Sequence, residues 1–140
     1  MNIKPIVFYT DDDHDDLDIF KVAVSDIDID LHLFRQSGEM LAEIQKGIIK
    51  PSIIFVDLNM PMISGYDVVE ILRAYGITTP IVILSTASNA LLINRVFNAG
   101  ANFFITKPTS LNLLKAAVKH ALNIDWNNFT PTIKEFSHKL

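Results

Sequence analysis

The sequence predicts an α/β domain with a parallel sheet covered by helices on both faces. Short apolar runs, rich in β-branched and aromatic residues, have the length and composition of buried strands. Each is followed by a segment with apolar residues at helical spacing, and no long linker interrupts the series. Five strand–helix repeats of this kind predict a parallel sheet with right-handed crossovers. The apolar runs are 6–10, 53–56, 81–84 and 102–106, with a strictly alternating run at 27–33.

The helices are expected between these runs. The alternation of 27–33 suits an edge strand with one solvent-facing side. Gly76 is placed to end the third helix, and Ser110 to cap the fifth. The helical segments are 15–24, 37–47, 66–75, 90–98 and 110–122.

Composition limits the classes of function. A chain of 140 residues with 49% hydrophobic and 20% charged residues suits one globular domain. The net charge of −4 argues against non-specific nucleic-acid binding, and the absence of cysteine excludes thiolate chemistry. No apolar stretch reaches the roughly 20 residues that span a bilayer, and no signal-peptide pattern is present. We therefore expect a cytoplasmic domain without a membrane or nucleic-acid partner.

Polar residues follow the strands where ligands bind in an open parallel sheet. Asp11 and Asp12 follow the run 6–10, and Asp57 follows 53–56. Ser85 follows 81–84, and Lys107 follows 102–106. All of them should face one crevice at the carboxyl ends of the strands. Clustered carboxylates repel one another unless a cation lies among them, and hard oxygen ligands favour Mg²⁺. A carboxylate beside a divalent cation, a hydroxyl and a lysine is typical of phosphoryl transfer.

In their order and spacing these residues resemble the receiver domain of two-component response regulators. The acidic pair, the run Val56-Asp57-Leu58-Asn59-Met60-Pro61 with Gly65 after it, Ser85, Gly100-Ala101 and Lys107-Pro108 all occur in family order. The resemblance implies a flavodoxin-like, doubly wound (βα)5 fold. Its strand order 2-1-3-4-5 is that of known chemotaxis receivers. We expect a receiver domain at 1–124 and an extension at 125–140.

The resemblance also implies a role for each acidic residue. Asp57 corresponds to the phosphate acceptor and joins the Mg²⁺ ligands. Asp12 corresponds to a direct ligand, and Asp11 acts mainly through a metal-bound water. Asn59 lends its backbone carbonyl to the metal.

Three further positions correspond to residues that respond to the phosphoryl group. Ser85 donates to a phosphoryl oxygen, a role for which the adjacent Thr86 is the alternative, and Lys107 pairs with the same group. Phe104 corresponds to the switching aromatic, which here has no hydroxyl and must act through packing. The family also suggests a cis bond between Lys107 and Pro108.

The function expected from the resemblance is a stand-alone, phosphorylation-dependent switch. The donor is a sensor histidine kinase or phosphotransfer protein, and an unknown output protein reads the fourth helix, fifth strand and fifth helix. A phosphorelay intermediate fits equally, and a constitutive interaction module is the alternative from another class. Enzymatic turnover is not expected, because Asn59 replaces the second acid of a phosphatase-like Asp-x-Asp pattern. An EF-hand is excluded because Asp16 and Val22 occupy the required Gly and Glu positions.

Three other features leave alternatives open. We expect His14 to be a solvated loop residue rather than a ligand. Leu91 falls outside the apolar stripe of the fourth helix, as an ordinary exposed leucine or as part of an interface. Thr130-Pro131 followed by Ile133, Phe136 and Leu140 predicts a short amphipathic helix or a frayed tail. A homodimer through the fourth helix or the extension is also considered.

Overall fold

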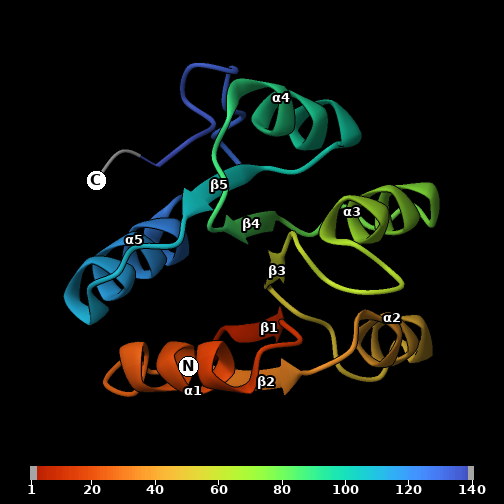
Figure 1. Ribbon diagram of the computed structural model, residues 1–140. Helices are drawn as coiled ribbons and strands as arrows, with labels where there is room; N and C mark the ends of the chain where they lie inside the picture. The colour runs from red at the N-terminus through yellow and green to blue at the C-terminus, as the bar shows by residue number, and fades with distance from the viewer. Residues whose placement is uncertain (1–2, 139–140) are drawn as a thin grey trace.

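The computed structural model describes residues 3–138 as an alternating series of five strands and five helices (Figure 1). The strands occur where the buried runs predict them, and no helix in this range is long and apolar enough to cross a bilayer. The elements are β1 (Ile6–Thr10), α1 (His14–Ala23), β2 (Asp30–Phe34), α2 (Ser37–Lys46), β3 (Ile53–Asp57), α3 (Gly65–Ala74), β4 (Ile81–Ser85), α4 (Ala90–Ala99), β5 (Phe103–Thr106) and α5 (Leu111–Asn123).

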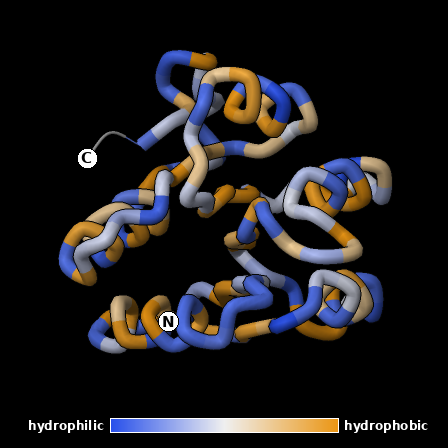
Figure 2. Tube along the Cα trace, in the orientation of Figure 1, coloured by the Kyte–Doolittle hydropathy of each residue, from blue (hydrophilic) through white to orange (hydrophobic). Residues whose placement is uncertain are grey.

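All strand pairings are parallel, in the order β2-β1-β3-β4-β5, which confirms the predicted fold. Helices α1 and α5 cover one face of the sheet, and α2, α3 and α4 cover the other (Figure 1). Each face has its own core, and hydrophobic residues lie along the central strands (Figure 2). Burial on both faces explains why the central strands read as continuous apolar runs.

Two expected boundaries shift for local reasons. Asp13 begins α1 earlier than expected, because its side chain accepts the backbone amides of Asp15 and Asp16 as an N-cap. The edge strand β2 is shorter than expected. Ile27 and Ile29 lie in a turn, where their amides donate to the carbonyls of Val24 and Ile27. The predicted cap at Ser110 is confirmed, since its side chain accepts the amide of Leu113.

Arg73 fastens the amino-terminal ends of β4 and β5. Its guanidinium donates to the carbonyls of Gly100 at 2.9 Å, Ile77 at 2.7 Å and Thr79 at 3.0 Å. It also donates at 2.6 Å to the side-chain oxygen of Asn102, which accepts the amide of Ile81 as well. We call this set of hydrogen bonds the arginine clamp, and it lies at the end of the sheet opposite Asp57.

The expectation of a short helix in the C-terminal segment, residues 130–138, is wrong, because these residues form a turn followed by a bridge. Residues 132–135 form a turn closed by the Glu135 amide and the Thr132 carbonyl, and Ser137 then forms a parallel bridge with Phe104. Phe136 is fully buried whereas Ile133 is 41% exposed, and Leu140 lies outside the described residues. Contacts with β5, which local spacing does not reveal, decide this conformation.

Candidate functional site

The sheet register brings the predicted site residues to one edge. Thr10 lies opposite Val56, so the next residues along, Asp11 and Asp57, are neighbours across β1 and β3. On the other side, Ser85 is paired with Thr106, the residue before Lys107. The backbone amide of Lys107 donates to the Ser85 carbonyl at 2.7 Å. The ends of four strands therefore supply the polar side chains.

Lys107 lies at the centre of the carboxylates. Its Nζ atom is 2.9 Å from Asp57 Oδ1, and it donates to Asp11 Oδ2 and Asp16 Oδ2 at 2.8 Å each. Asp11 and Asp57 are buried, and Asp16 is partly buried in the first turn of α1. The sequence resemblance did not single out Asp16, because its proximity depends on the orientation of α1.

Tyr9 is a second residue that the sequence reasoning missed. Its hydroxyl donates to Asp11 Oδ2 from the interior of β1. Burial, and then the Asp11 carboxylate, raise the pKa of Tyr9 far above its ordinary value, so the phenol stays a neutral donor. The sequence spacing of Tyr9 and Asp11 could have indicated this contact, because residues two apart on a strand share a face.

Burial and charge affect the site carboxyl and ammonium in different ways. Burial raises the pKa of the Asp57 carboxyl to about 6; Lys107 opposes this shift, and the carboxylates of Asp11 and Asp12 add to it. Burial would lower the pKa of Lys107, but its hydrogen bonds to Asp11, Asp16 and Asp57 outweigh burial and raise it. The lysine is therefore held charged, while ionisation of Asp57 is less favourable than that of an exposed aspartate.

The acidic side chains fit a divalent cation. Asp11, Asp12 and Asp57 each offer a carboxylate oxygen, and these oxygens lie within 4.8 Å of one another. All are hard oxygen donors, and Mg²⁺ prefers such a set with retained waters. Lys107 contacts three carboxylates, those of Asp11, Asp16 and Asp57, and Asp12 adds a fourth close to Asp11 and Asp57. The negative charge therefore exceeds that of the one ammonium, which leaves charge for a cation to balance.

The remaining predicted residues lie around this cluster. Ser85 is buried and its Oγ accepts the Ala87 amide at 3.1 Å, whereas the alternative Thr86 is exposed. Asn59 is exposed in the loop after β3. Phe104 is fully buried one strand away, paired with Ile83 of β4. The geometry places Ser85, rather than Thr86, among the buried groups.

Gly65 allows the loop after β3 to close against the strand. Its amide donates to the Leu58 carbonyl at 3.0 Å. A Cβ atom at Gly65 would lie 2.5 Å from the Asp57 carbonyl oxygen and 2.7 Å from Leu58 Cα. Both are backbone atoms and cannot swing aside, so this glycine is required by close approach rather than by an unusual φ.

The expected cis bond between Lys107 and Pro108 is wrong, since no peptide bond in residues 3–138 is cis. The trans form is intrinsically favoured by about 0.5–1 kcal/mol at X–Pro bonds.

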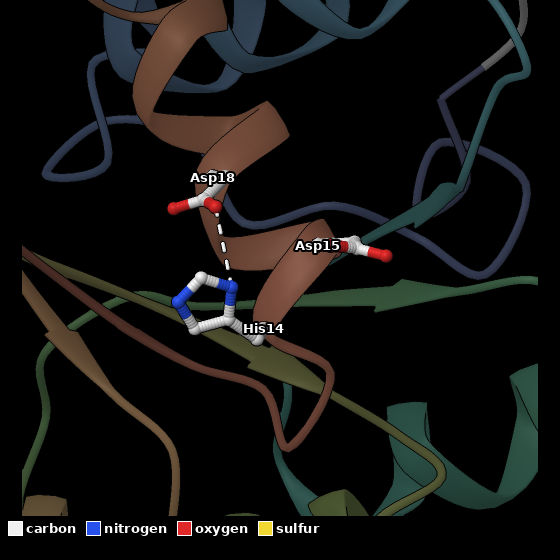
Figure 3. Close-up of side chains that lie close together, drawn as sticks. All are labelled: His14, Asp15 and Asp18. Atoms are coloured by element: carbon white, nitrogen blue, oxygen red, sulfur yellow. Dashed lines mark ion pairs between the residues drawn. The ribbon is translucent and has the colours of Figure 1, made fainter.

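His14 is exposed as expected, but it lies in a helix rather than in a loop. It is the exposed first residue of α1, and its Nδ1 lies 3.2 Å from Asp18 Oδ2, close to Asp15 (Figure 3). Leu91 is 82% exposed on α4.

The chain belongs to the family of response regulator receiver domains, whose family model matches residues 7–119. This result confirms the class inferred from the resemblance. Such domains act in two-component signalling, where histidine kinases and output domains are their partners.

Particular relatives define the extent of the match. The chain is 30% identical over 99 residues to the DNA-binding transcriptional activator EvgA of Escherichia coli, covering 65% of this chain and 48% of EvgA. It is 26% identical over 119 residues to the response regulator protein TodT of Pseudomonas putida, covering 85% and 52%. The chain thus spans about half the length of these curated relatives.

Solved structures share the fold. The phosphorylated cyanobacterial phytochrome response regulator RcpA matches with a TM-score of 0.78 at 22% identity, over 93% of this chain and 100% of RcpA. The chemotaxis response regulator CheY4 of Vibrio cholerae matches with a TM-score of 0.75 at 22% identity, over 84% and 98%. At this identity the likeness supports the fold alone.

Proposed function

We propose that this chain is a phosphorylation-dependent switch in which Asp57 accepts a phosphoryl group from a phosphohistidine. The donor is a sensor histidine kinase or a phosphotransfer protein. The observation that carries the proposal is the meeting of Asp57, Asp11 and Lys107 at the end of the sheet, with Lys107 Nζ 2.9 Å from Asp57 Oδ1. A buried carboxylate beside a fixed cation and further carboxylates suits nucleophilic attack on phosphorus.

The transfer step follows from these side chains. An oxygen of Asp57 attacks phosphorus, and a new O–P bond forms while the N–P bond to the donor imidazole breaks. The bonding electron pair stays on that imidazole nitrogen, and Asp57 becomes an acyl phosphate. Lys107 pairs with a phosphoryl oxygen, and the Ser85 hydroxyl donates to another. Both roles are proposals from position and chemistry.

The site also fits Mg²⁺ held by Asp11, Asp12, Asp57 and the backbone carbonyl of Asn59. A bound Mg²⁺ would neutralise charge on the phosphoryl oxygens. Asp11 is oriented for this purpose by Tyr9, and its second oxygen accepts the Asp13 amide at 3.0 Å. The chain's own contribution is to hold the carboxylates close together before the cation arrives.

The proposed output follows phosphorylation. The hydroxyl of Ser85 moves toward the phosphoryl group, and Phe104 turns into the space that opens. The surface of α4, β5 and α5 then changes for a partner. The chain itself is not proposed to turn over an external substrate; it assists only its own phosphorylation and dephosphorylation. A phosphorelay intermediate would use the same chemistry at Asp57.

Phosphorylation is tested by incubation with Mg²⁺ and a small acyl-phosphate donor, followed by intact-mass measurement. One acid-labile phosphoryl group should be added to the wild type, none to Asp57→Asn, and none when a chelator removes the metal. The matched control is Asp18→Asn, which removes an exposed carboxylate of α1 outside the cluster. Equal labelling of wild type and Asp57→Asn would refute the assignment, and a folded wild type that takes no phosphoryl group would favour a constitutive interaction module.

A further inference from the structure

The C-terminal segment, defined as residues 130–138, occupies the outer edge of β5. The amide of Phe104 donates to the Phe136 carbonyl at 2.9 Å, and the amide of His138 donates to the Phe104 carbonyl at 2.8 Å. Edge strands otherwise leave such backbone groups unpaired. Both backbone groups of Phe104 are therefore bonded to the segment, which lies beside β5 and α4 (Figure 1).

Phe136 anchors the segment on the α4 side of the sheet. Its side chain is fully buried, in the same core as α2, α3 and α4. Its ring centroid lies 5.1 Å from that of Phe97 on α4 and 6.3 Å from that of Phe104 on β5. Phe104 is therefore contacted by the segment through its backbone and through its ring.

The other side of the segment is loosely packed. A cavity of about 720 Å³ lies between the segment and α5, lined by Phe103, His120, Phe129, Ser137 and His138. Thr132, Ile133, Lys134 and Glu135 are exposed. The segment is held by its bridge to Phe104 and by the buried side chains of Pro131 and Phe136. The ring of His138 also lies near those of Phe103 and His120. The exposed turn adds little to this attachment, so we expect the segment to have lower local stability than the central strands.

We propose that the C-terminal segment is a latch, whose attachment to β5 depends on the position of the Phe104 side chain. It is engaged while Phe104 packs against Phe136, and it is released when Phe104 turns toward Ser85 in the phosphorylated protein. Release uncovers the β5 edge and the apolar site of Phe136, which then accept an extended, aromatic-containing segment of the output partner by strand addition. The latch rests on the proposed phosphorylation of Asp57, and it adds an autoinhibitory contact to that function.

Hydrogen exchange of individual amides tests the latch in the full chain. The amides of Phe104 and His138 should be protected without phosphorylation, and should exchange at least tenfold faster with Mg²⁺ and the acyl-phosphate donor. Amides of the central strand β3 provide the internal reference. Absence of a phosphoryl group by intact mass would overturn the proposed function; unchanged exchange in protein shown to be phosphorylated would overturn the latch alone.

Two variants test separately the anchoring role of Phe136 and the switching role of Phe104. Phe136→Ala should give fast exchange at Phe104 without phosphorylation, whereas Ile133→Ala, on the exposed side of the same segment, should not. Phe104→Leu should still be phosphorylated but should lose most of the exchange difference between the two states. Protection that survives in folded Phe136→Ala contradicts the anchor. A full exchange difference in Phe104→Leu contradicts the proposal that the Phe104 ring controls release of the segment. This test holds even where Phe136→Ala does not fold.

Discussion

Replacing Asp57 with asparagine should stabilise the metal-free protein at neutral pH. Burial raises the pKa of this carboxyl from 3.8 to about 6, so the folded protein binds its proton more tightly than the unfolded chain does. Stability therefore falls as pH rises from about 4 to about 6, and the loss is complete above that window. Asparagine keeps the shape of the side chain without the ionisation.

The magnitude follows from the pKa. Each pKa unit corresponds to about 1.4 kcal/mol, so a rise of this size makes ionisation about 3 kcal/mol less favourable in the folded state. Solvent screening at the open edge of the site reduces the effect to about 2 kcal/mol. For a domain of this size, that corresponds to about 5 °C in Tm.

Urea unfolding at pH 4.5 and pH 7.5, in chelator, measures this effect. The free energy of unfolding of the wild type should decrease between the two pH values by about 1 kcal/mol more than that of Asp57→Asn, because about half of the total loss has already occurred at pH 4.5. Asp28→Asn is the control, because Asp28 is an exposed carboxylate paired with Lys4 at the opposite end of the sheet. Parallel pH profiles for wild type and Asp57→Asn would refute the argument that ionised Asp57 is destabilising.

The remaining predictions concern the metal, the loop glycine and the arginine clamp. Mg²⁺ at about 100 times its Kd should raise the free energy of unfolding by about 2.7 kcal/mol in the wild type and much less in Asp12→Asn, as thermal melts with and without Mg²⁺ would show. Gly65→Ala should destabilise by about 2–3 kcal/mol in urea unfolding and slow phosphorylation, because its Cβ meets backbone of β3. Gly38→Ala, whose Cβ meets nothing within 4 Å, should be neutral or stabilising. Arg73→Met should cost about 2–4 kcal/mol in the same assay while the folded protein still accepts a phosphoryl group; equal loss of stability and phosphorylation capacity would contradict this separation.

The sequence predicted the sheet and the meeting of the site residues for a physical reason. Buried parallel strands need apolar side chains on both faces, so their ends are visible where the first polar residue appears. Because all five strands run the same way, Asp11, Asp57 and Lys107 had to reach the same edge. Strand order came from the family, since local pattern does not specify which strands are neighbours.

What the sequence did not reveal depends on tertiary contacts. Thr130-Pro131 and the spacing of Ile133 and Phe136 satisfy the local rules for a short helix. The unpaired edge of β5 offers competing backbone hydrogen bonds, and the core offers Phe136 a buried position. In the same way, Asp16 joins Lys107 only because α1 packs at a particular angle.

The arginine clamp has a mechanical consequence. Arg73 ties the amino-terminal ends of β4 and β5 together through four hydrogen bonds, while Ser85 and Lys107 lie at the opposite ends of the same strands. These hydrogen bonds restrain the two strands at one end, whereas the polar groups of the site lie at the other end. We therefore expect any displacement of Ser85 or Lys107 to leave the amino-terminal ends of β4 and β5 in place.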